Sequence, residues 1–334
     1  MIISSNMNQD RTFISQLYKV LNNGGDFVLA TVIKTWGSAP NPVGSMLIVN
    51  ALGEIFGSVS GGCVEGALII EAITTLKSNK CKVLTFGVTN EEAFQVGLAC
   101  GGEIQVLLEP FLKTDKIARD NLANFIQGYL NETLSIYSVD LNSFQRTVHK
   151  DTSKLALKIP VEKFDEGCSF ILGNTFYSIL SPRPKLIIVG AVHIAQFLTN
   201  FAQMFEYQVH VIDPRSTFAS TKRFPKVKIS VEWPDIVLNE ASLDKNCALI
   251  TLTHDPKIDD MALQKALDSD CFYIGSLGST RTHEQRINRF KLLGFKEEKI
   301  HRIKGPVGLD IGAKSANEIA LSIMAEIISV RRKR

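Results

Sequence analysis

Hydrophobic and polar positions follow different patterns in the two halves of the chain. In the first half, short runs rich in Val, Ile and Thr are interspersed with helical spacings and Gly-containing turns, which predicts an α+β domain. The predicted helices cover 10–22 and 64–77, and the predicted strands cover Phe27–Thr35, Met46–Val49, Glu54–Phe56, Val83–Phe86 and Ile104–Leu108. In the second helix, the spacing predicts that Ile69, Ile73 and Leu76 face the core.

From residue 185 onward, buried-type strands alternate with amphipathic helices. The predicted strands are Lys185–Val189, Val209–Ile212, Ala248–Leu252 and Phe272–Ile274, and the predicted helices are Ile194–Phe205, Thr282–Leu293 and Asn317–Val330. Strands separated by helices predict a Rossmann-like, doubly wound parallel sheet. The last helix begins with Ser315-Ala316-Asn317-Glu318, which has the pattern of a capping box.

A domain boundary is predicted at Ser181-Pro182-Arg183-Pro184, because two prolines so close together interrupt both helices and strand ladders. Residues 111–182 have a weaker pattern, with alternation only around Leu134–Val139 and Phe170–Ile179, and we interpret them as the rest of the first domain or as a hinge region. The sequence therefore predicts an N-terminal α+β domain over 1–182 and a separate C-terminal α/β domain over 183–334.

Composition narrows the class of protein. The chain has 334 residues, of which 45% are hydrophobic and 21% charged, so it can build ordinary cores for about two domains. Its net charge of +3 predicts no nucleic-acid partner, and the basic run 331–334 is expected to be a solvated tail. There is neither a bilayer-length apolar run nor a signal-peptide pattern. None of the six cysteines forms a C-x-x-C pair, so a reducing, cytoplasmic setting is expected.

The second half has the outline of a dinucleotide-binding unit. Gly190 ends its first strand and Asp213 ends the second, 23 residues later (213 − 190). This spacing is typical of a phosphate held at a helix N-terminus and of a carboxylate on ribose hydroxyls. However, Val192 occupies the position of the second fingerprint glycine, where a branched side chain obstructs the approach of a pyrophosphate. The fold prediction stands, but binding of NAD(P) or another nucleotide is disfavoured.

Two further loops are expected at the same edge of the parallel sheet, namely Thr253-His254-Asp255 and Gly275–Ser279. His254 and Asp255 either contact a ligand or form a tight turn in which Asp255 or Asp259 caps a helix. Gly275 and Ser276 are expected to offer small side chains and free amides to an anion. His193 is either a ligand contact or a surface residue. His193, His254, Asp255 and Asp259 match no metal-ligand spacing.

In the first half, Ser60-Gly61-Gly62-Cys63 leads into a helix. Free backbone amides and the helix dipole make this loop a candidate anion site, and the same field favours a reactive thiolate at Cys63. Glu65 lies in the first turn, where a carboxylate is favourable. The alternative is a small cysteine buried in a close-packed turn, and the same two interpretations apply to Cys100-Gly101-Gly102. The remaining cysteines are expected to be packing residues, namely Cys81, Cys168, Cys247 and Cys271.

Taken together, these strings resemble the XdhC/CoxI family, whose members are accessory proteins of xanthine dehydrogenase-type molybdenum hydroxylases. The matching strings of the first half are G-S-A-P-x-x-x-G-S-M at Gly37–Met46, G-S-V-S-G-G-C-V-E at Gly57–Glu65 and C-G-G-E-I-Q-V-L-L-E-P at Cys100–Pro110. Those of the second half are V-I-D-P-R at Val211–Arg215, T-H-D at Thr253–Asp255, Y-I-G-S-L-G-S at Tyr273–Ser279, G-P-V-G-L-D-I-G at Gly305–Gly312 and E-I-A-L-S-I-M-A-E-I at Glu318–Ile327.

The resemblance implies a homodimeric chaperone that holds the molybdenum cofactor (molybdopterin), supports its sulfuration beside a cysteine desulfurase and delivers it to the apo-hydroxylase. An insertion factor is therefore expected rather than a turnover enzyme. The thiolate of Cys63 is soft enough to contact the metal or a sulfur-transfer intermediate, and we expect it to do so. The expected cofactor-binding residues are Gly61, Gly62, Cys63, Glu65, Cys100, Gly101, Gly102, Gly190, His193, Asp213, Arg215, His254, Asp255, Gly275 and Ser276.

This sequence departs from the family pattern at two positions: Asn41 stands where Arg is usual, and Val192 where Gly is usual. Both changes fall where an anionic ligand would be held. Two other functions stay open. The first is an NAD(P)- or nucleotide-dependent oxidoreductase, which Val192 and the lack of a recognisable proton-transfer pair disfavour. The second is a nucleotide-sensing regulatory dimer, which would bind its ligand without any effect on a hydroxylase.

Overall fold

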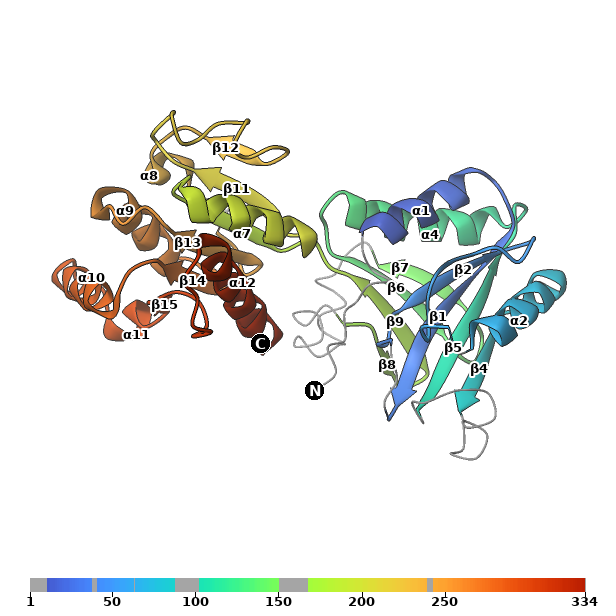
Figure 1. The fold of residues 1–334 in the computed structure, drawn as a ribbon. Helices are drawn as coiled ribbons and strands as arrows, with labels where there is room; N and C mark the ends of the chain where they lie inside the picture. Colours follow the sequence, from blue (N-terminus) through green and yellow to red (C-terminus); the bar gives the residue numbers. More distant parts are fainter. Residues whose placement is uncertain are drawn as a thin grey trace. The chain divides into compact units, whose positions relative to one another are not determined.

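The computed structural model describes residues 11–37, 41–62, 64–87, 102–149, 168–238 and 243–333. The chain divides into two compact units, Met1–Pro182 and Arg183–Arg334 (Figure 1). The first unit combines antiparallel sheets with helices, and the second is built on one parallel sheet. The predicted fold class is confirmed: an α/β Rossmann-type domain follows a separate α+β domain.

The first unit is built around a five-stranded antiparallel sheet in the order β3-β2-β1-β5-β4. Its strands are β1 (Phe27–Trp36), β2 (Met46–Asn50), β3 (Ile55–Gly57), β4 (Lys82–Gly87) and β5 (Glu103–Phe111). Alternate residues of β1 are buried on opposite faces, with Phe27 and Leu29 in one core and Val28 and Ala30 in another. Because both faces of the central strand are apolar, helices cover the sheet on both sides.

Helices α1 (Arg11–Asn22) and α4 (Lys116–Leu130) cover one face, and α2 (Glu65–Ser78) covers the other (Figure 1). The predicted buried face of α2 is wrong by one position. Leu68, Ala72 and Thr75 are buried, whereas the predicted inward residues are only half-buried. The buried carboxylate of Glu65 fixes the rotation of this helix, because positions +3, +7 and +10 from Glu65 share its face.

A second antiparallel sheet, in the order β7-β6-β9-β8, completes the first unit. Its strands are β6 (Ser135–Asp140), β7 (Arg146–His149), β8 (Phe170–Leu172) and β9 (Thr175–Leu180). The alternation seen in the sequence corresponds to β6, β8 and β9. No local pattern predicted α4, whose first turn is capped by Asp115 through a 3.0 Å hydrogen bond from the Ala118 N–H.

The second unit contains a six-stranded parallel sheet in the order β12-β11-β10-β13-β14-β15. Its strands are β10 (Lys185–Val189), β11 (Gln208–Ile212), β12 (Lys228–Ser230), β13 (Cys247–Thr251), β14 (Tyr273–Ser276) and β15 (Ile303–Lys304). Numbered within the unit, this order is 3-2-1-4-5-6, the order of a dinucleotide-binding fold. The two short edge strands, β12 and β15, had no signal in the sequence.

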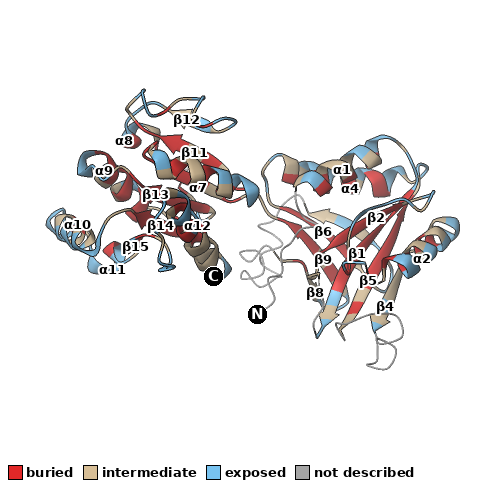
Figure 2. Ribbon diagram, viewed as in Figure 1, coloured by how far each residue is buried: buried red, intermediate tan, exposed pale blue. Residues whose placement is uncertain are grey.

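Helices cover both faces of this parallel sheet, whose strands are largely buried (Figure 2). One face carries α7 (His193–Met204) and α12 (Ala316–Arg332), and the other carries α8 (Pro234–Val237), α9 (Pro256–Leu267), α10 (Thr280–Leu292) and α11 (Glu297–Ile300). The predicted capping box of α12 is present, with the Glu318 carboxylate accepting the Ser315 N–H at 2.8 Å. Among the described residues, none of the helices is both long and apolar enough to cross a bilayer.

Candidate functional site

The candidate site lies where the order of the parallel sheet reverses. β10 pairs with β11 on one side and with β13 on the other, so the loops that follow β10 and β13 flank the switch point. These loops lie in contact, because a Cβ on Gly190 would stand 2.7 Å from Thr253 Cγ2. Gly190 also has a φ of +110°, which side chains disfavour. The predicted glycine is therefore required by close packing between the two loops.

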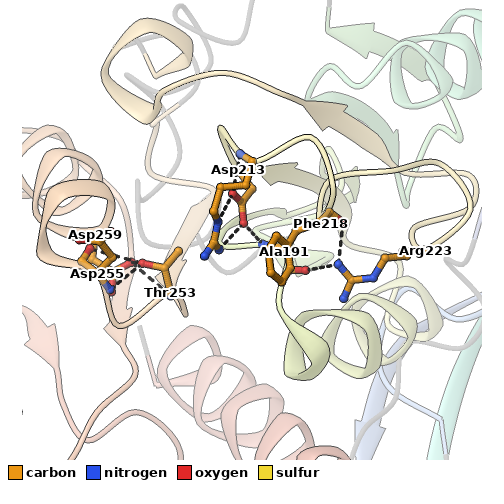
Figure 3. Close-up of polar contacts among 8 residues, drawn as sticks. Ala191, Asp213, Phe218, Arg223, Thr253, Asp255 and Asp259 are labelled. Carbon is orange, nitrogen blue, oxygen red and sulfur yellow. Dashed lines mark hydrogen bonds and ion pairs between the residues drawn. The ribbon is translucent and has the colours of Figure 1, made fainter.

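Asp213 lies directly after β11 and is fully buried. Its Oδ2 accepts hydrogen bonds from the Ala191 N–H and from Arg215 Nη2, each at 2.7 Å. Its Oδ1 accepts from the Arg215 N–H at 3.0 Å and from Arg215 Nε at 2.8 Å (Figure 3). Burial alone would raise the pKa of Asp213, but these hydrogen bonds outweigh it and lower that pKa.

The carboxylate of Asp213 is therefore already saturated by the protein. Two carboxylate oxygens accept about four hydrogen bonds in total, and four are present. The expectation that Asp213 offers free oxygens to ribose hydroxyls is wrong for this geometry. Its physical role is to join the turn before α7 to Arg215.

A second arginine holds the same turn from its carbonyl side. Arg223 Nη1 donates to the backbone oxygens of Ala191 and Phe218, both at 2.7 Å (Figure 3). The Phe218 ring packs against both arginines, with its centroid 4.4 Å from Arg215 Cζ and 5.7 Å from Arg223 Cζ. Two guanidinium groups thus flank the turn that leads into α7. Sequence reasoning missed Phe218 and Arg223, although the interleaving of basic and aromatic residues after Asp213 was a usable signal.

The N-terminus of α7 carries one exposed imidazole. His193 is the first residue of the helix, and its Nδ1 lies 3.4 Å from Gln196 Oε1. Its ring packs edge-on against Phe197, with centroids 5.0 Å apart. The preceding residue, Val192, is the N-cap and makes no side-chain capping bond. The amides of this first turn lack partners within the helix and are available to an anion.

The loop after β13 contains one capping residue and one buried acid. Asp255 Oδ1 accepts the Lys257 N–H at 3.0 Å, so Asp255 is the N-cap of α9, as one of the two sequence interpretations held. Asp259 is buried and accepts the Thr253 hydroxyl at 2.6 Å, while burial raises its pKa. His254 is exposed and has a φ of +63°.

Gly275 and Ser276 were expected to offer small side chains and free amides to an anion. Instead, both residues pack inside the sheet. Both belong to β14. The Ser276 side chain is fully buried and shares a 2.6 Å hydrogen bond with the Thr251 hydroxyl. A Cβ on Gly275 would stand 2.7 Å from Val307 Cγ2, so the small residue makes room for Val307.

The glycine loop of the first unit is filled by its own carboxylate. Glu65 is buried, and each of its oxygens accepts from a serine hydroxyl and from backbone N–H groups. The donors to Oε1 are Ser58 Oγ at 2.9 Å, Val59 N at 3.2 Å and Ser60 N at 2.9 Å, and the donors to Oε2 are Ser60 Oγ at 2.5 Å, Gly62 N at 2.9 Å and Val64 N at 3.2 Å. Burial opposes ionisation, but these bonds lower the pKa of Glu65 from 4.5 to about 2.

The prediction of free amides in this loop is therefore wrong. The Gly61 N–H is also occupied, since it donates to Ser58 Oγ at 2.9 Å. Asn41, which stands where the family pattern has Arg, donates through Nδ2 to the same hydroxyl at 3.2 Å. Cys63, Cys100 and Gly101 lie outside the described residues, and Gly102 is half-buried just before β5. Within the described residues, no group of three or more His, Cys, Asp or Glu side chains is placed to hold a metal ion.

The comparisons with known proteins cover both units. The family described as the XdhC Rossmann domain matches residues 186–327, and the family described as XdhC and CoxI matches 20–87. A molybdenum cofactor insertion chaperone, PaoD of Escherichia coli, is 29% identical over 96% of this chain and 88% of its own length. A Bacillus subtilis protein named as a probable subunit of xanthine dehydrogenase is 26% identical over 96% of this chain and 98% of its own length.

A solved structure shares the architecture as well. The crystal structure of a Bacillus halodurans protein described as a xanthine dehydrogenase superimposes with a TM-score of 0.76, at 26% identity and over 96% of both chains. The observed fold, the matched ranges and the full-length relatives agree with the strings found along the sequence. The chain belongs to the XdhC and CoxI family.

Proposed function

We propose that this protein is an accessory factor that binds the molybdenum cofactor as cargo and supports its insertion into a xanthine dehydrogenase-type molybdoenzyme. The similarity to a molybdenum cofactor insertion chaperone supports this role. The observation that carries it is the turn before α7, where Arg215 and Arg223 flank a helix N-terminus. This arrangement suits the phosphate of a pterin cofactor.

In this proposal, different residues of the chain serve different parts of the cargo. The first-turn amides of α7 hold the phosphate, and the exposed His193 side chain lies beside them. Cys63 is the sequence-predicted thiolate for the metal or for a sulfur-transfer intermediate. Glu65 binds the N–H groups of Gly62 and Val64, so it fixes the chain on both sides of position 63.

We propose that sulfuration takes place with a cysteine desulfurase, and that the protein acts as a homodimer in the cytoplasm. The partner is the apo form of the molybdenum hydroxylase, and neither nucleic acid nor a membrane takes part. The net charge of +3 on 334 residues supports the exclusion of nucleic acid.

Reconstitution tests the function directly. An apo-hydroxylase is co-expressed with and without this protein, and the active, sulfurated fraction is measured. We expect that fraction to rise with the intact protein and to fall toward the unassisted level with Cys63→Ala. Cys81→Ala is the matched control, because it removes another thiol of the same domain that lies outside the glycine loop.

A second measurement separates the proposal from a nucleotide-dependent oxidoreductase. The purified protein is denatured, and the fluorescence of released, oxidised pterin is compared with the NADH that it retains. The proposal predicts pterin. Retained NADH without pterin, together with an unchanged active fraction of the hydroxylase, would overturn it in favour of the oxidoreductase.

A further inference from the structure

We propose that the switch-point site, formed by the loops after β10, β11 and β13, selects a phosphomonoester over a dinucleotide, with Arg215 as the specificity-determining residue. The inference deepens the proposed function and rests on it for the identity of the cargo. The structure carries it through the hydrogen bonds of Asp213, the placement of Val192 and the two arginines packed on Phe218.

Two features that a dinucleotide needs are replaced at the switch-point site. A dinucleotide-binding fold presents a free carboxylate at the end of the second strand to the ribose hydroxyls. Here all four acceptor positions of Asp213 are taken by Ala191 and Arg215. Such a fold also has a glycine that lets the pyrophosphate approach the backbone, and here Val192 is the N-cap of α7. A ribose diol and a pyrophosphate therefore both lose their usual partners.

In place of these features, the switch-point site has a guanidinium group beside the helix N-terminus. Asp213 Oδ2 accepts from both the Ala191 N–H and Arg215 Nη2, so these two donors lie no more than two hydrogen-bond lengths apart. Nε and Nη2 of Arg215 are used by Asp213, and no acceptor contacts Nη1 within the described part of the chain. The Arg215 side chain is 36% exposed, and it shares Asp213 Oδ2 with the Ala191 N–H of the turn that leads into α7.

The surrounding contacts hold this guanidinium in place before a ligand arrives. The Phe218 ring lies 4.4 Å from Arg215 Cζ, and the Phe218 carbonyl accepts from Arg223. Arg223 also binds the Ala191 carbonyl and Gln196, all neutral groups, so its charge is not offset by these contacts. Asp213 neutralises Arg215, while Asp255 and Asp259 face Arg215 from the β13 loop at longer range. The positive charge is thus concentrated on the α7 side.

A single tetrahedral phosphate dianion matches this donor set. Such a phosphate can accept hydrogen bonds from the amides of the first turn of α7 and from Arg215 Nη1 at the same time. It does not need the close approach to the backbone that Val192 obstructs. Molybdopterin ends in a phosphomonoester, whereas its dinucleotide forms carry a pyrophosphate and a ribose at that end. The geometry therefore assigns the phosphomonoester form as the cargo of this chain.

Calorimetry on the purified full-length chain tests this selectivity with simple probes. The titrants are adenosine monophosphate, adenosine, NAD⁺ and inorganic phosphate. We expect adenosine monophosphate to bind and inorganic phosphate to compete with it. Adenosine should bind at least about tenfold more weakly, because it lacks the phosphate that makes the charge-assisted contact. NAD⁺ should also bind at least about tenfold more weakly, because Val192 obstructs its pyrophosphate and Asp213 has no free acceptor for its ribose. Binding of NAD⁺ as tight as that of adenosine monophosphate would overturn the inference.

A matched pair of variants isolates Arg215. Arg215→Gln is expected to weaken binding of adenosine monophosphate by about tenfold or more. Arg289→Gln is the control, because Arg289 makes the same type of two-point ion pair, with Asp260, and its side chain is 35% exposed. Equal losses in the two variants, or no loss in Arg215→Gln, would refute the role of Arg215. Because no pterin or hydroxylase is used, this test can fail or succeed independently of the proposed function.

Discussion

Replacing Glu65 with Gln removes the charge on which the glycine loop of the first unit is built. The carboxylate accepts from two serine hydroxyls and from the N–H groups of Val59, Ser60, Gly62 and Val64. An amide has only one oxygen, so its NH₂ group would face donors on one side. The fall in pKa from 4.5 to about 2 corresponds to at most about 3 kcal/mol of folding stability. Water at the loop edge screens part of it, so we expect Glu65→Gln to lose about 2 kcal/mol at about pH 7.

The sign of the pH dependence follows from the lowered pKa. Stabilisation by Glu65 is fully present above its unfolded pKa of 4.5 and is lost as the pH falls through the folded value of about 2. The unfolding free energies of the wild type and of Glu65→Gln should therefore converge on acidification. Urea unfolding can be followed through the fluorescence of Trp36, in a background with Trp233→Phe, so that only the first unit reports.

Glu71→Gln on the same helix is the control for this experiment. Glu71 is a partly exposed partner of Lys82, and its loss should change the unfolding free energy by less than about 1 kcal/mol. Equal stability of Glu65→Gln and wild type at about pH 7 would refute the reasoning. A difference between them that stays constant across the acid range would refute it as well.

Two further predictions concern the second unit and use thermal and urea unfolding. Gly190→Ala should lower the free energy of unfolding by about 1–3 kcal/mol, because the new Cβ would stand 2.7 Å from Thr253 Cγ2 at a φ of +110°. Gly312→Ala, with open space around the new Cβ, should lower it by about 1 kcal/mol, and equal losses in the two variants would contradict the close approach. Asp213→Asn should lower the free energy of unfolding by about 1–3 kcal/mol at about pH 7. The loss should shrink on acidification because folding lowers the pKa of Asp213, and a loss that is independent of pH would contradict the ion pair with Arg215.

The regular elements were largely predictable, because strand and helix periods are local properties of the sequence. The order of the parallel strands was not, since it depends on which strands pair across the fold. Helix α4 was not predicted from the sequence because its buried face contains a charged residue. Arg119 is buried there, and its guanidinium donates to the carbonyls of Gly25 and Phe111 at 2.9 and 3.2 Å. A cation among apolar positions conceals the helical period.

At the candidate sites, the sequence located the loops but not the state of their hydrogen bonds. Glu65 was recognised as a favourable first-turn acid. The Glu65 carboxylate can reach the loop amides because the backbone has left-handed φ values of +76° at Gly61 and +114° at Gly62. No sequence pattern specifies these values. Arg215, two positions after Asp213, was a local signal for an ion pair that would use up the carboxylate. Which groups remain free for a ligand is a property of the folded network.

In both units a glycine-containing turn leads into a helix N-terminus and is bound by a carboxylate of the chain, but the two turns differ in the charge that surrounds this carboxylate. In the first unit, the chain supplies its own anion, and within the described residues only hydroxyls and N–H groups contact the oxygens of Glu65. A phosphate brought to that loop would meet a second negative charge without a cation between them, and Asn41 supplies none. In the second unit, the internal anion Asp213 comes with Arg215, and Arg223 adds a further positive charge. Electrostatics therefore favours the N-terminus of α7 over the glycine loop of the first unit as the place for the phosphate of an incoming cofactor.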